Sequence, residues 1–143
     1  MEGKARAQQR VARLAANDRF AHAMGVEYVD GGPGYAKVAM TVREQHLNFN
    51  GSCHGGAIFA LADAAFGLAS NSHGAIAAGI DAHITYQLAA VLGDELTAVA
   101  VEVSRSRKLA VYRIDVARAD GAMVSSFTGT VYVTARHHDG SAG

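Results

Sequence analysis

The chain has 143 residues, and its 13 Lys and Arg residues balance its 13 Asp and Glu residues. This length fits one domain, and the lack of net charge argues against nucleic acid as the main partner. Half of the residues are hydrophobic and 18% are charged, a composition typical of a globular protein with a sizeable core. With 16 Gly, one Pro and no Trp, that core is expected to consist mainly of small aliphatic residues.

The cysteine content and the apolar segments bear on the compartment. Cys53 is the single cysteine, so an internal disulfide is impossible, and this favours a reducing compartment such as the cytoplasm. The first twenty residues are basic but lack the apolar run of a signal peptide, and Asp63 interrupts the longest apolar stretch. The sequence therefore predicts a cytoplasmic protein that is neither secreted nor inserted in a membrane.

The first part of the chain is predicted to form one helix and one hairpin. Residues 4–17 have the apolar spacing of an amphipathic helix that docks on the core. A short strand over 26–30 leads to Gly31-Gly32-Pro33-Gly34, which is a concentrated turn signal. Residues 35–43 then alternate between apolar and polar, the period of a half-buried strand.

A helix that is apolar on nearly every side is predicted next, from after Gly56 to Ser70. Short separators that suit antiparallel hairpins divide the rest into strand-like segments over about 76–90, 95–105, 109–118 and 122–134. These segments predict a sheet of six strands wrapped around one buried helix. A single small sheet cannot cover such a helix completely, so a second subunit is expected to cover the rest.

Asp63 is the exceptional residue of this helix, because its neighbours are small or apolar. An ionised carboxylate without a partner is costly to bury, so Asp63 needs a polar partner, a bound proton or a solvent-filled pocket. A purely structural role is the alternative. Asp is a poor helix former and cannot act as a cap at mid-helix, which favours a functional role.

The turn His54-Gly55-Gly56 lies where this helix begins and presents backbone N–H groups at the positive end of the helix dipole. Such a turn either binds a developing oxyanion or is only a flexible entry to the helix. At about 100° per residue, the nine steps from His54 to Asp63 predict that the two face opposite sides of the helix. A site that uses both would then need a second subunit.

Other polar residues near the turn give weaker indications. Asn48 has an amide that can bind a carbonyl or a water, or can simply stabilise a turn. Ser52 or Cys53 beside His54 could suggest covalent catalysis, but adjacent residues rarely reach the geometry of a nucleophile and its base. The seven His residues show no metal-ligand spacing, so no metal is expected.

Arg105, Arg107 and Lys108 form a basic turn between two predicted strands. Such a cluster is usually a solvated hairpin tip, although Arg can also bind phosphates through its planar fork. The sequence contains no glycine-rich motif of the kinds that bind nucleoside triphosphates or dinucleotides, so those ligands are not expected.

The segment from His46 to Phe66 resembles the hotdog-fold acyl-CoA thioesterases, and specifically their PaaI branch. The matching pattern is Asn48, five residues, His54-Gly55-Gly56, six residues and Asp63, and the strand order is similar over about residues 20–134. The resemblance implies a single α+β hotdog domain over residues 1–143, with a six-stranded antiparallel sheet around one long central helix. It also implies an extra N-terminal helix and homodimers with a continuous sheet that pair into homotetramers. A flexible tail is expected over 137–143.

In this family the acid that matches Asp63 activates a water or attacks the thioester carbon, and it faces the turn of the partner subunit. The N–H that matches Gly55 polarises the thioester carbonyl. The residues that match Asn48 and His54 orient water and carbonyl. The resemblance thus implies an acyl-CoA thioester hydrolase without metal or cofactor that acts on phenylacetyl-CoA or its ring-hydroxylated derivatives in phenylacetate catabolism.

Further residues are expected to contact the substrate. We assign to the acyl site Gly56, Phe59, Phe66 and Tyr86. We assign to the CoA phosphates Arg105, Arg107 and Lys108. No partner other than the acyl-CoA substrate and further copies of the chain is expected.

The sequence departs from some relatives at two points. Where some have a Ser at the start of the strand after the helix, this chain has Ala78-Gly79-Ile80, and where others have a hydroxyl residue one turn after the acid it has Gly67. Water positioning is therefore expected to depend on Asn48 and His54. Two alternatives stay open because one fold hosts several functions: a hotdog enoyl-CoA hydratase or dehydratase, and a non-catalytic acyl-CoA-binding domain.

Overall fold

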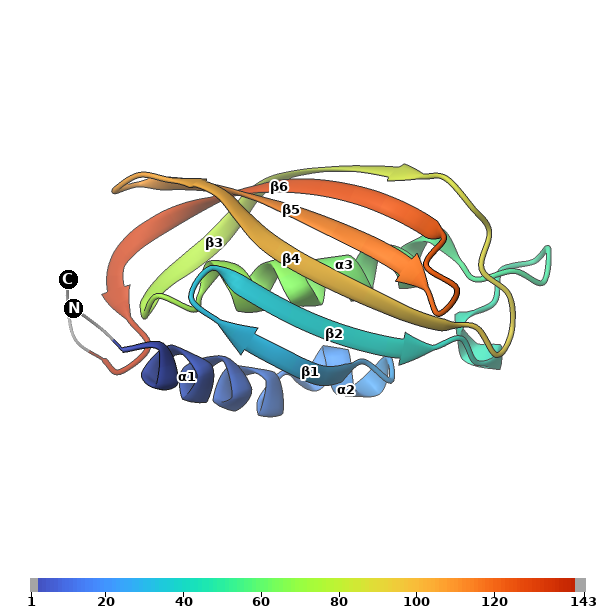
Figure 1. The fold of residues 1–143 in the computed structure, drawn as a ribbon, viewed down its shortest axis with the longest axis horizontal. Coiled ribbons are helices and arrows are strands. Elements are labelled where there is room, and N and C mark those ends of the chain that lie inside the picture. Colours follow the sequence, from blue (N-terminus) through green and yellow to red (C-terminus); the bar gives the residue numbers. More distant parts are fainter. Residues whose placement is uncertain (1–2, 141–143) are drawn as a thin grey trace.

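A computed structural model describes residues 3–140, which form one six-stranded antiparallel sheet and three α-helices (Figure 1). In chain order the elements are α1 (Lys4–Ala16), α2 (Arg19–Ala23), β1 (Glu27–Gly32), β2 (Tyr35–Thr41), the 3-10 helix η1 (Glu44–His46), α3 (Gly55–Ser70), β3 (Ala75–Tyr86), β4 (Glu95–Arg105), β5 (Leu109–Arg118) and β6 (Met123–His137). The predicted α+β hotdog architecture is confirmed.

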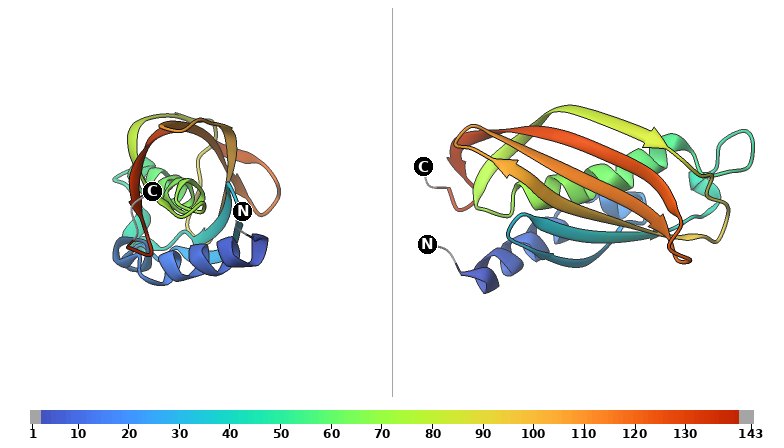
Figure 2. Two further views of the ribbon diagram at one scale, coloured as in Figure 1. Left: turned by 90° about the vertical axis from the view of Figure 1, so that its left-hand side faces the viewer. Right: turned by 45° about the horizontal axis from the view of Figure 1, so that its top comes forward.

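The sheet has the order β1-β2-β4-β5-β6-β3 and curves around α3, which lies inside it when the molecule is viewed from its end (Figure 2). The alternation of side chains in the strands explains this arrangement. In β2, for example, every second residue, Ala36, Val38 and Met40, is buried against the helix. The connections β1–β2, β4–β5 and β5–β6 are antiparallel hairpins, as the turn signals predicted.

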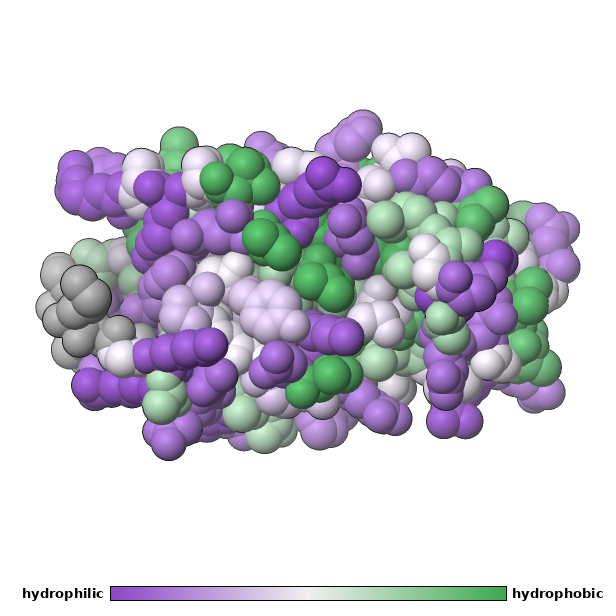
Figure 3. All heavy atoms as spheres, in the orientation of Figure 1, coloured by the Kyte–Doolittle hydropathy of each residue, from purple (hydrophilic) through white to green (hydrophobic). Residues whose placement is uncertain are grey.

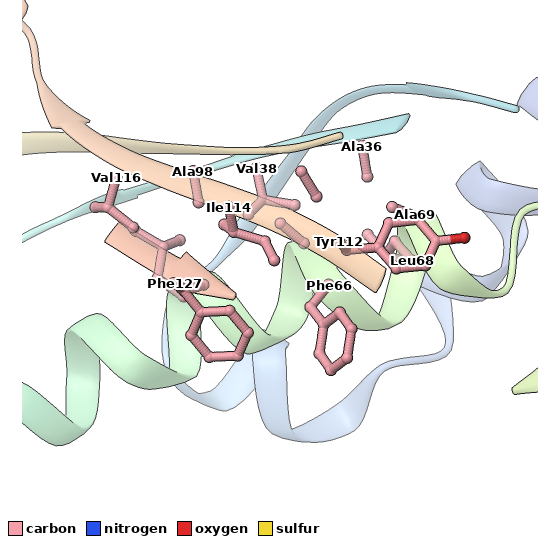
Figure 4. Close-up of a cluster of buried hydrophobic side chains, with 14 of the residues drawn as sticks. Ala36, Val38, Phe66, Leu68, Ala69, Ala98, Tyr112, Ile114, Val116 and Phe127 are labelled. Carbon is pink, nitrogen blue, oxygen red and sulfur yellow. The ribbon is translucent and has the colours of Figure 1, made fainter. Parts of the chain in front are cut away.

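The core lies between α3 and the concave face of the sheet (Figure 4). Phe66 fills its centre, with ring centroids 5.5 Å from Phe127 and 6.0 Å from Tyr112. Small residues make room for this ring: a Cβ placed on Gly129 would lie 2.6 Å from it. The richness of the chain in Gly and Ala is therefore partly explained by close packing around α3.

One stripe of α3 is left uncovered by the sheet. Gly56, Asp63 and Gly67 are exposed along it, and Ala60 is half-buried. The short helix α2 packs near this stripe, and α1 lies along β1 (Figure 1). Strand β3 forms one edge of the sheet and is exposed over most of its length, with 57% of Ile80 accessible. The expectation that one sheet cannot cover the helix is confirmed for the described chain.

Three details differ from the sequence-based expectations. Helix α2 and η1 were not expected, because five and three residues are too short to show a hydrophobic period. Strand β3 ends at Tyr86, not near residue 90, because the Ala90 carbonyl leaves the sheet and accepts a hydrogen bond from the Cys53 N–H at 2.8 Å.

The start of the expected flexible tail is anchored. Strand β6 includes His137, and the His138 N–H donates to the Gly74 carbonyl at 2.9 Å. Residues 141–143 of that tail lie outside the described part of the chain. No helix within residues 3–140 is long and apolar enough to cross a membrane.

Candidate active site

Asp63 lines a cavity of about 450 Å³ between α2 and α3. Most of its walls are apolar, from Leu14, Phe20, Ala21, Met24, Val26, Ala60, Ala64, Gly67 and Leu68, and its polar groups are Asp18, Asp63, Asn71 and His138. Within residues 3–140 no donor makes a hydrogen bond with the Asp63 carboxylate. The sequence analysis required a polar partner, a bound proton or a solvent-filled pocket for Asp63, and the structure shows the pocket.

The pocket raises the pKa of Asp63 above its ordinary value. The larger cause is the loss of hydration beside apolar walls, and the smaller is the negative charge of Asp18. A carboxylate with a raised pKa is a stronger base than an ordinary one. This environment suits a group that accepts a proton from water or attacks an electrophile.

The turn before α3 is held by His54, which caps the helix. The His54 Nδ1 accepts a hydrogen bond from the Gly56 N–H at 2.8 Å, so the ring proton is assigned to Nε2. The Gly55 N–H has no acceptor within the described part of the chain. Of the two glycines, Gly55 therefore offers its backbone donor to a ligand, at the positive end of the helix dipole.

Asn48 organises the loop that precedes this turn. Its Oδ1 accepts hydrogen bonds from the Asn50 N–H at 2.9 Å and the Ser52 N–H at 3.2 Å. The amide oxygen therefore stabilises the loop, which is the turn-stabilising role considered for Asn48 in the sequence analysis. The amide NH₂ group has no acceptor among residues 3–140 and stays available as a donor.

Asp63 and the turn lie on one face of α3, so the expectation of opposite faces is wrong. His54 is the cap and has an extended backbone, so it cannot be counted as a helical residue. Gly56 and Asp63 are seven residues apart on the same exposed stripe. What separates the groups is distance: eight residues from Gly55 to Asp63 correspond to about 12 Å along the axis. One chain therefore cannot direct both groups at a single carbonyl.

The aromatic residues assigned to the acyl site occupy different places. Tyr86 lies beside the turn, where its hydroxyl donates to the Gly55 carbonyl at 3.1 Å. Phe59 is half-buried against Phe127, with ring centroids 5.3 Å apart. The assignment of Phe66 to the substrate is corrected, because only 4% of this residue is accessible and its ring fills the core.

Arg105, Arg107 and Lys108 are exposed at the β4–β5 tip, a hydrophilic part of the surface (Figure 3). This tip lies near the end of the molecule where α3 finishes, and the turn before α3 lies at the other end (Figure 1). The structure therefore does not bring the basic tip to the His54-Gly55-Gly56 turn of the same chain.

Two chemical alternatives can be compared with the structure. Cys53 is buried, and burial raises the pKa of its thiol to about 11, which leaves very little thiolate at neutral pH. A nucleophilic role for Cys53 is thus unsupported. Among residues 3–140, no group of three or more His, Cys, Asp or Glu side chains has the geometry of a metal site.

Sequence reasoning missed Asp18 and His138, which share the pocket of Asp63. Asp18 caps α2 by accepting a hydrogen bond from the Ala21 N–H at 3.0 Å. Asn17-Asp18 before Arg19 is a sequence signal for a helix cap. Nothing in the sequence indicates that Asp18 lies near α3. His138 was treated as part of a polar tail, whereas its Nε2 lies 2.8 Å from the Asn71 Oδ1 at the pocket wall.

Comparisons with known proteins identify the family of the chain. Residues 50–125 match the family model of the thioesterase superfamily. Acyl-coenzyme A thioesterase PaaI of Escherichia coli is 36% identical over 124 residues, which are 87% of this chain and 89% of that protein. The structure of the E. coli PaaI protein, from the phenylacetic acid degradation operon, superposes with a TM-score of 0.88 at 35% identity, covering 91% of this chain and 94% of that one.

A second solved structure extends the comparison to a ligand complex. The structure of smu.793 from Streptococcus mutans UA159, bound to acetyl CoA, is similar with a TM-score of 0.74 and 32% identity. The alignment covers 76% of this chain and 88% of that one. Sequence match, fold and relatives are consistent, and this chain belongs to the thioesterase superfamily as a PaaI-type hotdog thioesterase.

Proposed function

We propose that the protein hydrolyses the thioester bond of aryl-acyl-CoA substrates, namely phenylacetyl-CoA or its ring-hydroxylated derivatives, and acts in phenylacetate catabolism. The observation that carries the proposal is the accessible Asp63 carboxylate, whose pKa is raised, in an apolar pocket of about 450 Å³. That volume is ample for an aromatic ring, since a cavity of roughly 150 Å³ already binds benzene. The name and operon of the E. coli relative support the same substrate class.

The reaction needs a group that acts on the carbonyl carbon and a donor for the carbonyl oxygen. Asp63, when ionised, takes a proton from the attacking water or attacks the carbon directly. The Gly55 N–H stabilises the negative charge that develops on the oxygen. In the first route the water oxygen bonds to the carbonyl carbon, the C–S bond breaks, and the proton held by Asp63 passes to the departing CoA thiolate. In the second route the C–S bond breaks as an anhydride with Asp63 forms, the thiolate takes a proton from water, and a water molecule then hydrolyses the anhydride to the free acid and Asp63. His54, through Nε2–H, and the Asn48 amide then bind the water or the carbonyl. Neither route requires a metal or a cofactor.

A second copy of the chain completes this site. Asp63 and Gly55 lie about 12 Å apart along α3, so the turn facing Asp63 comes from a partner subunit. The exposed edge of β3 supports this arrangement, because a long edge strand with free hydrogen-bonding groups is a ready pairing surface. Pairing of two β3 strands would give a continuous sheet, and two such dimers would give the expected homotetramer.

The CoA end of the substrate is proposed to contact the basic β4–β5 tip of a neighbouring subunit. Arg105, Arg107 and Lys108 are too far from the turn of their own chain, so only an assembly could bring them to the same ligand. The acetyl CoA bound to the streptococcal relative supports a CoA ester as the ligand class. The single reduced Cys53 is consistent with a cytoplasmic setting.

The decisive experiment measures free-thiol release from a panel of acyl-CoA esters that includes phenylacetyl-CoA, acetyl-CoA and medium-chain esters. We expect the aryl-acyl esters to have the highest kcat/KM. A preference for straight-chain esters would contradict the proposed substrate class. Loss of the conjugated absorbance of an enoyl-CoA, without thiol release, would instead support the hydratase alternative. No observation favours that alternative, since His138 in the pocket is bonded to Asn71.

A further inference from the structure

The loop between β2 and α3 carries an aromatic side chain that its own chain leaves in solvent. Phe49 is 97% accessible, whereas the other exposed large apolar residues of the described chain are at most 65% accessible. The loop projects from the end of the molecule, beyond the start of α3 (Figure 1). A whole aromatic ring in water forgoes the stabilisation that burial gives, so Phe49 is suited to a contact with another molecule.

Hydrogen bonds fix this loop and therefore the position of the ring. The Asn48 N–H donates to the Ser52 carbonyl at 2.8 Å, and the Gly51 N–H donates to the Asn48 carbonyl at 3.0 Å. The Asn48 side chain adds the bonds described above. The closed loop comes immediately before the His54-Gly55-Gly56 turn, so Phe49 accompanies the turn wherever the turn binds.

The proposed pairing of subunits directs this loop toward the pocket of the partner. If the turn of one chain faces Asp63 of the other, two-fold symmetry requires the reverse contact as well. Parallel α3 helices cannot make both contacts, whereas antiparallel helices can. Residues before Gly55 in one chain then lie beside residues after Asp63 in the other. Gly67 follows Asp63 by four residues, about 6 Å along the helix, and an extended loop covers that distance in about two residues.

The pocket beside Asp63 is open where this loop arrives. Gly67 lines the pocket, and a Cβ added to it would meet nothing within 4 Å. Phe20, which also lines the pocket, is 65% accessible. An exposed apolar wall and an exposed ring gain free energy when they cover each other, because both lose contact with water. The open side of the pocket and Phe49 are therefore complementary.

We propose that Phe49 of one subunit covers the open side of the partner's acyl pocket, beside Gly67 and Phe20, and contacts the acyl group bound there. The inference rests on the proposed function, because it requires the turn of one subunit to face Asp63 of a second copy of the chain. In this position Phe49 is a specificity-determining residue. It binds an aryl group by apolar contact and limits the length of acyl group that the pocket accepts.

The first test compares Phe49→Ala with the conservative variant Phe49→Leu. We expect Phe49→Ala to raise KM for phenylacetyl-CoA about tenfold, since partial burial of one aromatic ring is lost. KM for acetyl-CoA, whose acyl group is too short to reach the ring, should change less than about threefold, and Phe49→Leu should restore most of the difference. The matched control is Val29→Ala, because Val29 is also exposed but lies on β1 and does not line the pocket.

The outcomes separate this inference from the proposed function. An unchanged KM for phenylacetyl-CoA in Phe49→Ala, with Asp63→Asn inactive, would overturn the role of Phe49 and leave the proposed function intact. Failure of the wild type to hydrolyse any arylacetyl-CoA, with turnover of other esters, would instead contradict the proposed function.

Mixed oligomers show on which subunit the ring acts. Phe49→Ala and Asp63→Asn chains are unfolded together and refolded, so that hybrid pairs form. In a hybrid pair, one site combines Asp63 of the first chain with Phe49 of the second, and the other site has neither. We therefore expect the mixture to contain active sites with the wild-type KM. If every active site keeps the raised KM of Phe49→Ala, Phe49 acts on the pocket of its own chain and the inference is overturned.

A disulfide cross-link gives a readout that does not depend on activity. Phe49→Cys and Gly67→Cys are combined in a Cys53→Ala background, and each is also made alone. Oxidation should join two chains covalently only when both new cysteines are present. Equal cross-linking by Phe49→Cys alone would show that two loops contact each other and would overturn the inference. Absence of a cross-link, together with Phe49-dependent binding to vesicles of anionic phospholipid, would also overturn it and assign the ring to a lipid surface.

Discussion

Substitution of Asp63 by Asn removes the carboxylate from the pocket while it keeps the size of the side chain. We expect kcat for phenylacetyl-CoA to fall by about a hundredfold or more, because loss of a general base typically costs a factor of about 10² to 10⁴. A hundredfold loss corresponds to about 2.7 kcal/mol of transition-state stabilisation. In the pocket of the described chain, His138 is hydrogen-bonded to Asn71 and Asp18 lies at the start of α2, so neither takes the position of Asp63 on α3.

The same substitution should not destabilise the fold. The pKa of Asp63 is raised in the folded chain, so the folded state binds this proton more tightly than the unfolded state does. Its contribution to stability is present at pH below the unfolded pKa, and it is lost as the pH rises through the raised pKa. At neutral pH the ionised Asp63 is therefore unfavourable to folding, and Asp63→Asn should have an equal or higher Tm.

The assay combines thiol release from phenylacetyl-CoA with thermal unfolding followed by circular dichroism. The expected result is a large loss of kcat together with an unchanged or raised Tm at pH 7. Asp120→Asn, at a position that does not line the pocket, should leave kcat unchanged, and because it removes an ion pair with Arg118 it should not raise the Tm. Near-normal turnover by Asp63→Asn would refute the role of Asp63, and a lowered Tm at pH 7 would refute the reasoning about its desolvation.

Four further predictions concern the pocket, the loop before α3 and the β3 edge. The kcat/KM of the wild type should rise with pH through an apparent pKa above the ordinary range of an Asp, because the pocket raises the pKa of Asp63 and the reaction needs its ionised form; a pH-rate profile measures this. Gly67→Ala should fold and gain up to about 1 kcal/mol in the free energy of unfolding, since Ala is the better helix former. Its added methyl group enters the pocket, so KM for aryl-acyl esters should rise, and an unchanged KM would argue against an acyl site there. Cys53 should react slowly with a disulfide reagent at pH 8 until the protein is unfolded, because it is 6% accessible and its thiol has a pKa of about 11; Cys53→Ala should keep most of the activity. Ile80→Asp should lower the molar mass measured by light scattering and the activity together, because it puts a charge on the exposed edge of β3 where a partner is proposed to pair.

Most of the fold could be predicted because its signals are local in the sequence. The alternation of Ala36, Val38 and Met40 indicates which face of a strand is buried, and short polar separators indicate hairpins. The end of β3 could not be predicted in this way. The segment after Tyr86 is hydrogen-bonded to the loop before α3, and these two parts of the chain are distant in sequence.

The candidate site was only partly predictable for the same reason. Asp63 stands out by composition alone, but nothing near it in the sequence indicates that Asp18 faces the same pocket. Phe66 could not be placed, because an aromatic residue in a helix that is apolar on nearly every side fits the core and a pocket equally well. The prediction that the turn and Asp63 lie on opposite sides of α3 was wrong because the residues were counted from His54. His54 is the N-cap of the helix and lies outside the helical period.

Helix α3 has to serve two purposes, and the distribution of its side chains follows from both. Toward the sheet it presents Phe66 and Leu61, which fill the core, and on the opposite stripe it presents Ala60, Asp63 and Gly67. Large apolar residues on that stripe would cover the helix and add stability to a single chain. They would also fill the pocket beside Asp63. The small residues therefore leave the chain with an uncovered helix face, a desolvated carboxylate and a free sheet edge, features that weaken one subunit and that a second subunit can use to complete the site.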